Sequence, residues 1–285
     1  MLRRRWLFLI YLCALTLSLA AVTSRPLAYQ KSNAIRGAAY FPALDRGRPF
    51  DVAATIGAIP YQPGVVGSVL PQQKYLQTIE GGLGNCSQKA FGLAWQLGRE
   101  GREHQVVHLL PLDSFLDGGG HTLLRTEVTW EGRDAVGVVD MLQGALPLTR
   151  GRLVDLPDLV AGPIEEFRFA LLNPGGEDSI EYYGEFLDTA VVGVISTAAI
   201  ARYFRFLERV YVPLGNERLE KLVFDGLAIV MGFYPAIDVV EVDRLFAGRR
   251  LERAGYRTAL WVFRSAIVIF PLFVGLELLA RRERN

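Results

Sequence analysis

Three residues of this chain have side chains that together could perform nucleophilic chemistry: Cys86, His121 and Asp140. A cysteine thiolate attacks an acyl carbon, a histidine transfers the proton, and a carboxylate orients the imidazole and stabilises its charged form. The order Cys, His, Asp along the chain therefore predicts a thiol catalytic triad. The alternative is structural, because a lone cysteine is commonly a small buried hydrophobic residue, a strand-end histidine can be solvated and an aspartate can close a turn.

The stretch GGLGNCSQKAFGLAWQLG, residues 81–98, predicts a helix that begins at the cysteine. Asn85 is a favoured N-cap residue, and Gln88 follows three positions later as in a capping box. The i, i+3, i+4, i+7 spacing of a buried helix face is present at Ala90, Leu93, Ala94 and Leu97. Cys86 then meets free backbone N–H groups and the positive end of the helix dipole, which lower a thiol pKa and can hold an oxyanion.

Two alternating segments further on predict a hairpin that carries the other two residues. HTLLRTEVTW begins with His121, a turn follows at Glu131, Gly132 and Arg133, and the second strand, DAVGVVD, ends on Asp140. The midpoint between His121 and Asp140 falls beside this turn. The two side chains should therefore come level across neighbouring strands, within a residue or two.

These segments resemble the transglutaminase-like branch of the papain-like cysteine enzymes. The resemblance rests on GLGNC, KAFGLAWQLGREG, HQVVHL, HTLLRTEV and VGVVDMLQG, in this order. It implies an α+β fold, with the cysteine helix packed on an antiparallel sheet that carries the histidine and the aspartate. It also implies acyl transfer or hydrolysis at an amide bond of a protein or peptide, catalysed by Cys86, His121 and Asp140 with no cofactor.

Two alternatives within this resemblance stay open. If the acceptor is water the enzyme is a protease or deamidase, and if it is an amine the enzyme makes crosslinks; similar bacterial proteins favour hydrolysis. The second alternative is a catalytically inactive module for envelope binding or assembly. Leu123 favours that module because many members carry an aromatic residue two places after the histidine, whereas the intact triad favours an enzyme.

A metal site is not predicted. His104 and His108 have the i, i+4 spacing that a zinc protease uses on a helix, but Gln105 stands where such a protease needs glutamate. The valines between them favour a strand, and no third ligand accompanies the pair.

The composition points to a membrane and not to a nucleic acid, since 51% of the residues are hydrophobic and the net charge is only +1. Residues 1–24, with three arginines ahead of an uncharged run, predict a signal anchor that crosses the membrane; a cleaved signal peptide is the alternative. Cys13 lies in this run as an apolar residue. The exported domain then holds only Cys86, and an unpaired thiol outside the cytoplasm favours catalysis over packing.

Shifts in composition predict the remaining organisation. Residues 25–150 form the transglutaminase-like domain and residues 151–257 a helical subdomain, of which 185–240 either lies against the core or forms a membrane hairpin. Residues 258–280 predict a second transmembrane helix, with a helix packed on the domain as the alternative, and residues 281–285 a basic cytoplasmic tail. The positive-inside rule places both termini in the cytoplasm and the triad outside. The bilayer is thus an expected partner besides the amide substrate, and the sequence sets no oligomeric state.

Overall fold

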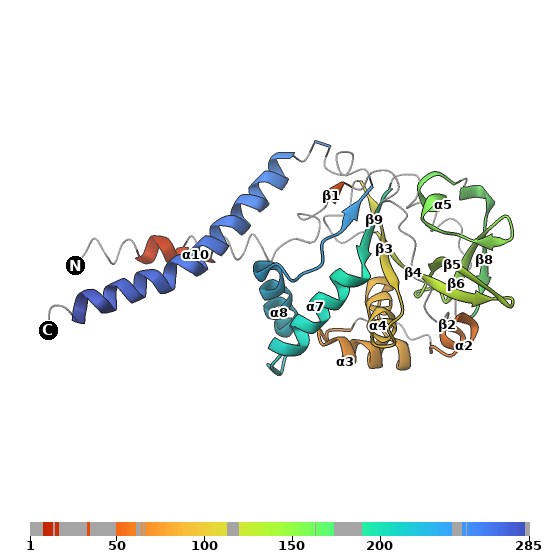
Figure 1. Cartoon of the computed structure of the whole chain (residues 1–285), viewed down its shortest axis with the longest axis horizontal. Helices are drawn as coiled ribbons and strands as arrows, with labels where there is room; N and C mark the ends of the chain where they lie inside the picture. The colour runs from red at the N-terminus through yellow and green to blue at the C-terminus, as the bar shows by residue number, and fades with distance from the viewer. Residues whose placement is uncertain are drawn as a thin grey trace.

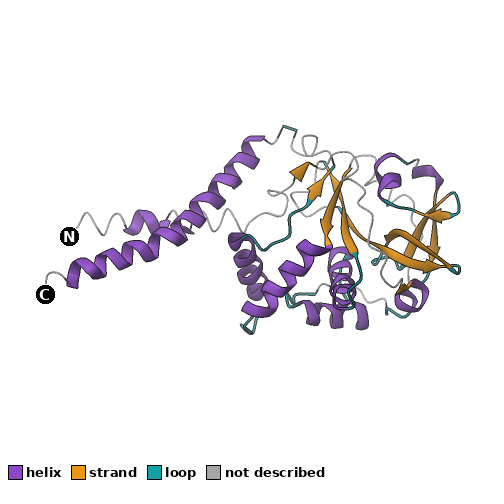
Figure 2. Cartoon of the chain, in the orientation of Figure 1, coloured by secondary structure: helices purple, strands orange, loops and turns teal. Residues whose placement is uncertain are grey.

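A computed structural model describes residues 8–13, 15–16, 33–34, 50–60, 64, 66–112, 120–162, 164–173, 190–240, 247–248 and 250–282 (Figure 1). Its helices are α2 (Val52–Gly57), α3 (Pro71–Tyr75) with the π-helical turn η3 (Leu76–Glu80), α4 (Cys86–Arg99), α5 (Leu156–Ala161), the 3-10 turn η5 (Ile164–Glu166), α7 (Thr197–Val210), α8 (Glu217–Met231) and α10 (Arg250–Arg282). Its strands are β1 (Asn33–Ala34), β2 (Phe50–Asp51), β3 (His104–Pro111), β4 (His121–Trp130), β5 (Arg133–Val139), β6 (Ala145–Thr149), β7 (Arg152–Leu153), β8 (Phe167–Leu171), β9 (Ala190–Ser196) and β10 (Asp238–Val239). The predicted α+β class is confirmed (Figure 2).

The main sheet has the order β1-β10-β9-β3-β4-β2, and β5 also pairs with β4. Strand β3 lies between β9 and β4 and is antiparallel to both. The two short strands are parallel to their partners: β1 pairs with β10, and β2 pairs with β4. Consecutive strand residues point to opposite faces, so one strand can serve two cores. Val106 and Leu110 lie in a core with Leu93 of α4 and Phe204 of α7, whereas Val107 lies in a second core.

That second core closes the other face of the sheet. It contains Val107, Leu109, Leu123 and Val138 from the sheet together with Leu156, Leu159 and Phe167 from α5 and β8. The fully buried pattern of β3 and β4 follows from this two-sided covering, because each strand must supply apolar residues at successive positions.

The hairpins β4–β5 and β6–β7 both have two-residue turns. Glu131 and Gly132 join β4 to β5 with φ values of 49° and 74°, and Arg150 and Gly151 join β6 to β7 with φ values of 50° and 73°. Two successive left-handed residues match the right-handed twist of the strands on either side. The predicted turn is therefore confirmed at Glu131 and Gly132 but wrong at Arg133, which pairs with Trp130 and begins β5.

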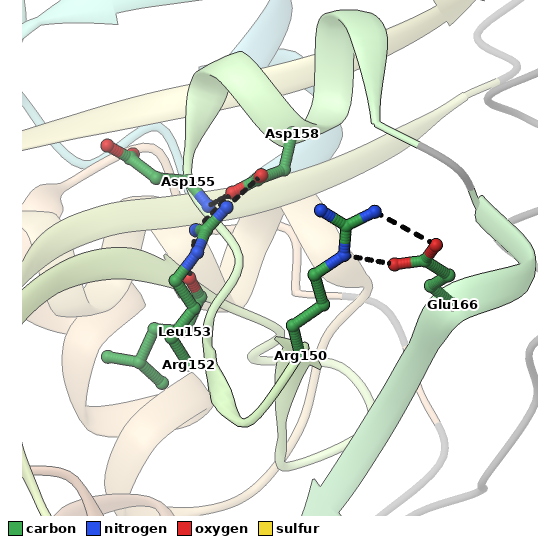
Figure 3. Close-up of polar contacts among 6 residues, drawn as sticks. All are labelled: Arg150, Arg152, Leu153, Asp155, Asp158 and Glu166. Carbon is green, nitrogen blue, oxygen red and sulfur yellow. Dashed lines mark hydrogen bonds and ion pairs between the residues drawn. The ribbon is translucent and has the colours of Figure 1, made fainter.

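A small sheet of order β7-β6-β8 follows, and a bridge between Asp140 and Ala145 connects it to the end of β5. Ion pairs fix its outer edge (Figure 3). Arg150 donates two hydrogen bonds to Glu166, at 2.6 and 3.0 Å, and Arg152 does the same to Asp158, at 2.7 and 2.5 Å. These exposed pairs set the orientation of the turn between β6 and β7.

The prediction of a helical subdomain over 151–257 is right for α7 and α8 but wrong for β7, β8, β9 and β10. Residues 190–196, which we expected to be helical, form β9 in the main sheet, paired with β3 from Ala190 to Ser196. The β-branched residues of AVVGVIS are compatible with a strand, and the pairing with β3 places this run in the sheet, where its central part is covered on both faces. Ser196 then caps α7, accepting a hydrogen bond from the N–H of Ala199.

The long helix α10 leads away from the sheet, and residues 8–13 form a short helical piece that lies along it (Figure 1). Tyr11 donates a hydrogen bond to the carbonyl of Ala266 and stacks on Phe270. The guanidinium of Arg264 donates to the carbonyls of Val230 and Ile229 at the end of α8. This part of α10 therefore packs on the domain, as in the alternative that we gave for residues 258–280.

Within the ranges given above, no helix combines the length and the apolar character that crossing a membrane needs. The two predicted terminal spans are thus not confirmed. Most of residues 1–24 and positions 283–285 of the predicted tail lie outside the described residues, and Arg281 and Arg282 continue α10.

Candidate active site

Helix α4 begins at Cys86, as the sequence predicts, and its start is fixed by a complete capping box. The N–H of Gln88 donates to Asn85 Oδ1 at 2.9 Å, and the N–H of Asn85 donates to Gln88 Oε1 at 3.0 Å. The Gln88 side chain also binds both backbone groups of Val66. This one side chain therefore fixes both the helix start and the preceding segment that passes beside it.

The glycine-rich approach to the cysteine is needed for space. Gly82 has a φ of +72°, and a Cβ there would lie 1.6 Å from the carbonyl oxygen of Pro60. Only glycine allows the chain to pass Pro60 so closely and then turn into α4. The position of the thiol thus depends on a backbone contact that lies several residues before it.

The triad residues His121 and Asp140 are brought together by the hairpin, as predicted. His121 Nε2 lies 2.9 Å from Asp140 Oδ2, and both side chains have no exposed surface. The other carboxylate oxygen, Oδ1, accepts the N–H groups of Leu142 at 2.9 Å and Gln143 at 3.1 Å. Asp140 is therefore held rigidly by the turn behind it, and it orients the imidazole.

Cys86 is the partner of His121 on the other side of the ring. The thiol hydrogen-bonds to the His121 side chain, and because Nε2 is engaged by Asp140, the nitrogen that remains for this contact is Nδ1. Burial raises the pKa of the Cys86 thiol, but the hydrogen bond and charge of His121, with hydrogen bonds to Thr122, outweigh it and leave the pKa lowered.

The pKa of His121 is shifted in the opposite direction to that of Cys86. Burial lowers its pKa, but the attraction of Asp140 and the interactions with Asp140 and Cys86 raise it to about 10. A lowered thiol pKa beside an imidazole pKa raised to about 10 favours the thiolate–imidazolium form of this pair. This is the charge state in which a cysteine is a nucleophile and its histidine a proton donor.

Sequence reasoning missed Thr122, a neighbour of the thiol, and His108, which contacts Thr122. Thr122 hydrogen-bonds to Cys86 and lies 3.0 Å, through Oγ1, from His108 Nδ1. Burial and the nearby charge of His121 lower the pKa of His108 to about 4, so this ring is neutral at pH 7. The strand pairing brings these two residues together, since His108 and Thr122 are directly opposite each other.

A third missed residue is Lys89, which is only 2% exposed. It stands three positions after Cys86 on α4, and burial lowers its pKa while the charge of Asp140 raises it. A lysine on the otherwise apolar face of the predicted helix was the signal that could have revealed it. It therefore places a second basic side chain near the carboxylate that orients His121.

The start of α4 also supplies unused backbone donors. The N–H of Gln88 is taken by Asn85 Oδ1 and that of Lys89 by the carbonyl of Asn85. Within the described part of the chain, the N–H groups of Cys86 and Ser87 have no acceptor. Two free N–H groups beside the nucleophile are suited to an oxyanion.

The two histidines of the apparent zinc pattern lie on strand β3 and face different partners. His104 Nδ1 lies 2.9 Å from the carbonyl oxygen of Arg102, whereas His108 belongs to the thiol site. Both cysteines of the chain, Cys13 and Cys86, are free thiols.

The arrangement as a whole can perform acyl chemistry: a thiolate at a helix start, an imidazolium in contact with it, and a buried carboxylate behind the ring.

Comparisons with family models, curated proteins and solved structures find no match to this chain.

Proposed function

We propose that the protein is a cysteine acyltransferase or hydrolase that acts on amide bonds of a protein or peptide, with Cys86, His121 and Asp140 as its triad. One observation carries the proposal: the half-buried Cys86 thiol hydrogen-bonds to His121, whose other ring nitrogen lies 2.9 Å from Asp140. The helix-on-sheet placement of these residues is also compatible with the resemblance to transglutaminase-like enzymes with a papain-like core.

In the first half of the reaction, the Cys86 thiolate attacks the amide carbonyl carbon and forms a C–S bond. The carbonyl electron pair moves to oxygen, where the N–H groups of Cys86 and Ser87 can donate hydrogen bonds. When the electron pair returns, the C–N bond breaks, and the His121 imidazolium gives its proton to the leaving nitrogen. The products are a thioester on Cys86 and a free amine or ammonia.

In the second half, the now neutral His121 takes a proton from the acceptor. If the acceptor is water, its oxygen attacks the thioester carbon, the C–S bond breaks and a carboxylic acid leaves. Asp140 stabilises the imidazolium in each half without taking a proton itself. We favour water as the acceptor, and an amine acceptor, which would give a crosslink, is the second outcome to measure.

The alternative is an inactive module that uses the same fold for envelope binding or assembly. The ionised pair argues for the enzyme, because a thiol kept only for packing needs neither a buried imidazolium nor a carboxylate behind it. Leu123 does not decide between the two, since its fully buried side chain belongs to the core behind the sheet.

The decisive experiment is covalent trapping. The purified protein is incubated with a peptide nitrile or another electrophilic amide analogue, and the mass of the adduct and the modified residue are measured. We expect one adduct on Cys86, lost in Cys86→Ser and slowed in His121→Ala. Unmodified Cys86, or modification that does not depend on His121, would favour the inactive module.

We also propose that the active site faces the outside of a membrane, with both ends of the chain on the cytoplasmic side. The contact of Tyr11 with Ala266 supports a common location for the two terminal segments. Apolar side chains exposed on both segments, such as Ile10 and Trp261, are 63% and 70% accessible and suit a lipid environment.

A further inference from the structure

A pocket lies directly beside the start of α4. Its α4 wall is made by Asn85, Ser87, Gln88 and Phe91, and the remaining lining residues are Val66, Ser68, Val69, Lys74, Tyr203, Lys221, Asp225 and Tyr234. Asn85 and Ser87 are the two chain neighbours of Cys86. The pocket is thus built by α3, α7 and α8 against the turn of helix that carries the nucleophile.

The pocket and the thiol site share a wall. Phe91 lines the pocket, and its ring centroid is 6.4 Å from that of His108, the histidine that contacts Thr122. Ser87 and Phe91 lie one helical turn apart and therefore on the same side of α4. A substrate that reaches Cys86 along this side of the helix passes over the pocket.

The ionisable lining of the pocket includes two lysines, Lys74 and Lys221, and one carboxylate, Asp225. Asp225 accepts a hydrogen bond from the Tyr203 hydroxyl at 2.5 Å, and Lys221 stands one turn before it on α8. Burial raises the pKa of Asp225, an effect that the charge of Lys74 opposes. The carboxylate already has a donor, so the cationic excess of the pocket rests on the two lysines.

Lys74 is the cation that the pocket separates most from water. Its Nζ lies 5.9 Å from the ring centroid of Phe91, and burial lowers the pKa of Lys74. Among the residues that the structure describes, no carboxylate lies within ion-pair distance of this ammonium group. A desolvated ammonium without a close counter-ion gains stability when an anion binds beside it.

We propose that this pocket binds a carboxylate of the acyl donor, held by Lys74 and Lys221, next to the amide that Cys86 attacks. The proposal rests on the proposed thiol chemistry and names its substrate class: peptides that carry an acidic side chain or a terminal carboxylate beside the reacting amide. Phe91, Tyr203 and Tyr234 suit the aliphatic part of such a residue.

The test uses three alkylating probes of nearly the same size: chloroacetyl-glutamate α-amide with a side-chain carboxylate, chloroacetyl-glutamine with an α-carboxylate, and the neutral chloroacetyl-glutamine α-amide. Each forms a C–S bond with Cys86 and releases chloride. Rates are measured by mass spectrometry on the full chain in a Cys13→Ser background, because Cys13 is also a free, exposed thiol. The variants are Lys74→Met and the control Arg209→Gln, which removes an exposed charge of α7 outside the pocket.

We expect one carboxylate probe to react roughly tenfold faster than the neutral probe, as a partly desolvated ion pair would give. The faster probe identifies the source of the carboxylate. The preference should disappear in Lys74→Met, so that the three probes react at similar rates, and it should persist in Arg209→Gln. If Lys74→Met also loses its reaction with the neutral probe, Lys74→Arg must keep the preference and Lys221→Gln must lower it.

Equal rates for the three probes, or a preference that survives in Lys74→Met, would overturn the carboxylate pocket while leaving the thiol chemistry standing. Reaction with every probe at the rate of a free thiol, unchanged by His121→Ala, would remove the proposed function and the substrate pocket with it.

Discussion

Thr122 and His108 face each other across the central strands β3 and β4, and the threonine Oγ1 lies 3.0 Å from the histidine Nδ1. The same threonine hydrogen-bonds to the Cys86 thiol. The nucleophile is therefore contacted from two sides, by the charged His121 and by a hydroxyl that a neutral histidine holds in place. The first prediction tests this second contact.

Thr122→Val should raise the thiol pKa and slow the alkylation of Cys86 near neutral pH about three- to tenfold, because a hydrogen bond to the thiolate is lost with little change of volume. The pH profile of iodoacetamide modification measures it. Thr126→Val is the matched control, since that buried hydroxyl donates to the carbonyl of Glu103 instead. Equal profiles for the two variants would remove Thr122 from the site.

The opposite pKa shifts of Cys86 and His121 define a pH window for activity. The Cys86 pKa is below its ordinary value of 9.0, and the His121 pKa is raised to about 10. Amide hydrolysis should rise with pH as the thiolate forms and fall as pH passes about 10, where the imidazolium loses its proton. A pH profile of kcat/KM measures both limits. A rising limb centred at or above the ordinary thiol value would contradict the ion pair.

Asp140→Asn should lower activity less than Cys86→Ser, because the nucleophile remains and only the orientation and charge of the imidazole change. It should also lower the His121 pKa. A raised histidine pKa stabilises the fold fully below the unfolded value of roughly 6.5 and loses this effect as pH rises through the folded value. The Tm difference from the wild type should therefore be present at pH 6 and narrow toward pH 10.

Asp134→Asn is the control for this comparison, since that exposed aspartate accepts a hydrogen bond from Thr129 at the far end of the same hairpin. It should change neither the His121 pKa nor the Tm profile. An Asp140→Asn protein whose Tm difference widens with pH would mean that Asp140 does not stabilise the imidazolium.

Cys86→Ser separates chemistry from folding. The side chain lies at the first position of α4 and is only half-buried, so its replacement by serine should leave the Tm within about five degrees. Amide turnover should be abolished. A calorimetric scan and an activity assay on the same sample measure the two effects. A large loss of Tm with measurable residual turnover would return Cys86 to a packing role.

The proposed location can be tested with reporter fusions. An alkaline-phosphatase reporter joined after Gly144 should be active and one joined after Asn285 silent, because the arginine clusters at both ends favour the cytoplasmic side. A silent fusion at Gly144 would place the triad in the cytoplasm. An active fusion at Asn285 would place the C-terminus outside.

The start of α4 and the hairpin of β4 and β5 could be predicted from the sequence because their signals are local. A cap residue, a glutamine three positions later and a two-residue turn with glycine each fix the chain through neighbours in the sequence. The contact of His121 with Asp140 follows directly from that hairpin. The predicted strand alignment, with His121 level with Asp140, differs from the observed one by only two residues, since Leu124 pairs with Val139.

The surroundings of the triad could not be predicted in the same way, since they depend on distant pairing. Thr122 meets His108 only because β3 and β4 pair in one register, and Lys74 and Asp225 line one pocket although their helices are far apart in the chain. The apolar run of β9 has the composition of a buried helix or a buried strand. Only its place beside β3 decides between them.

The position of β9 also sets the order in which the protein can become functional during synthesis. Strand β3 pairs with β9 along its length, from Gln105 opposite Ser196 to Pro111 opposite Ala190. The pocket beside Cys86 also needs Tyr203 and Asp225, which come still later in the chain. A nascent chain that has reached only Gly144 holds all three triad residues with one edge of β3 unpaired. The pocket beside Cys86 is therefore incomplete until Tyr234, in the last third of the polypeptide, has left the ribosome.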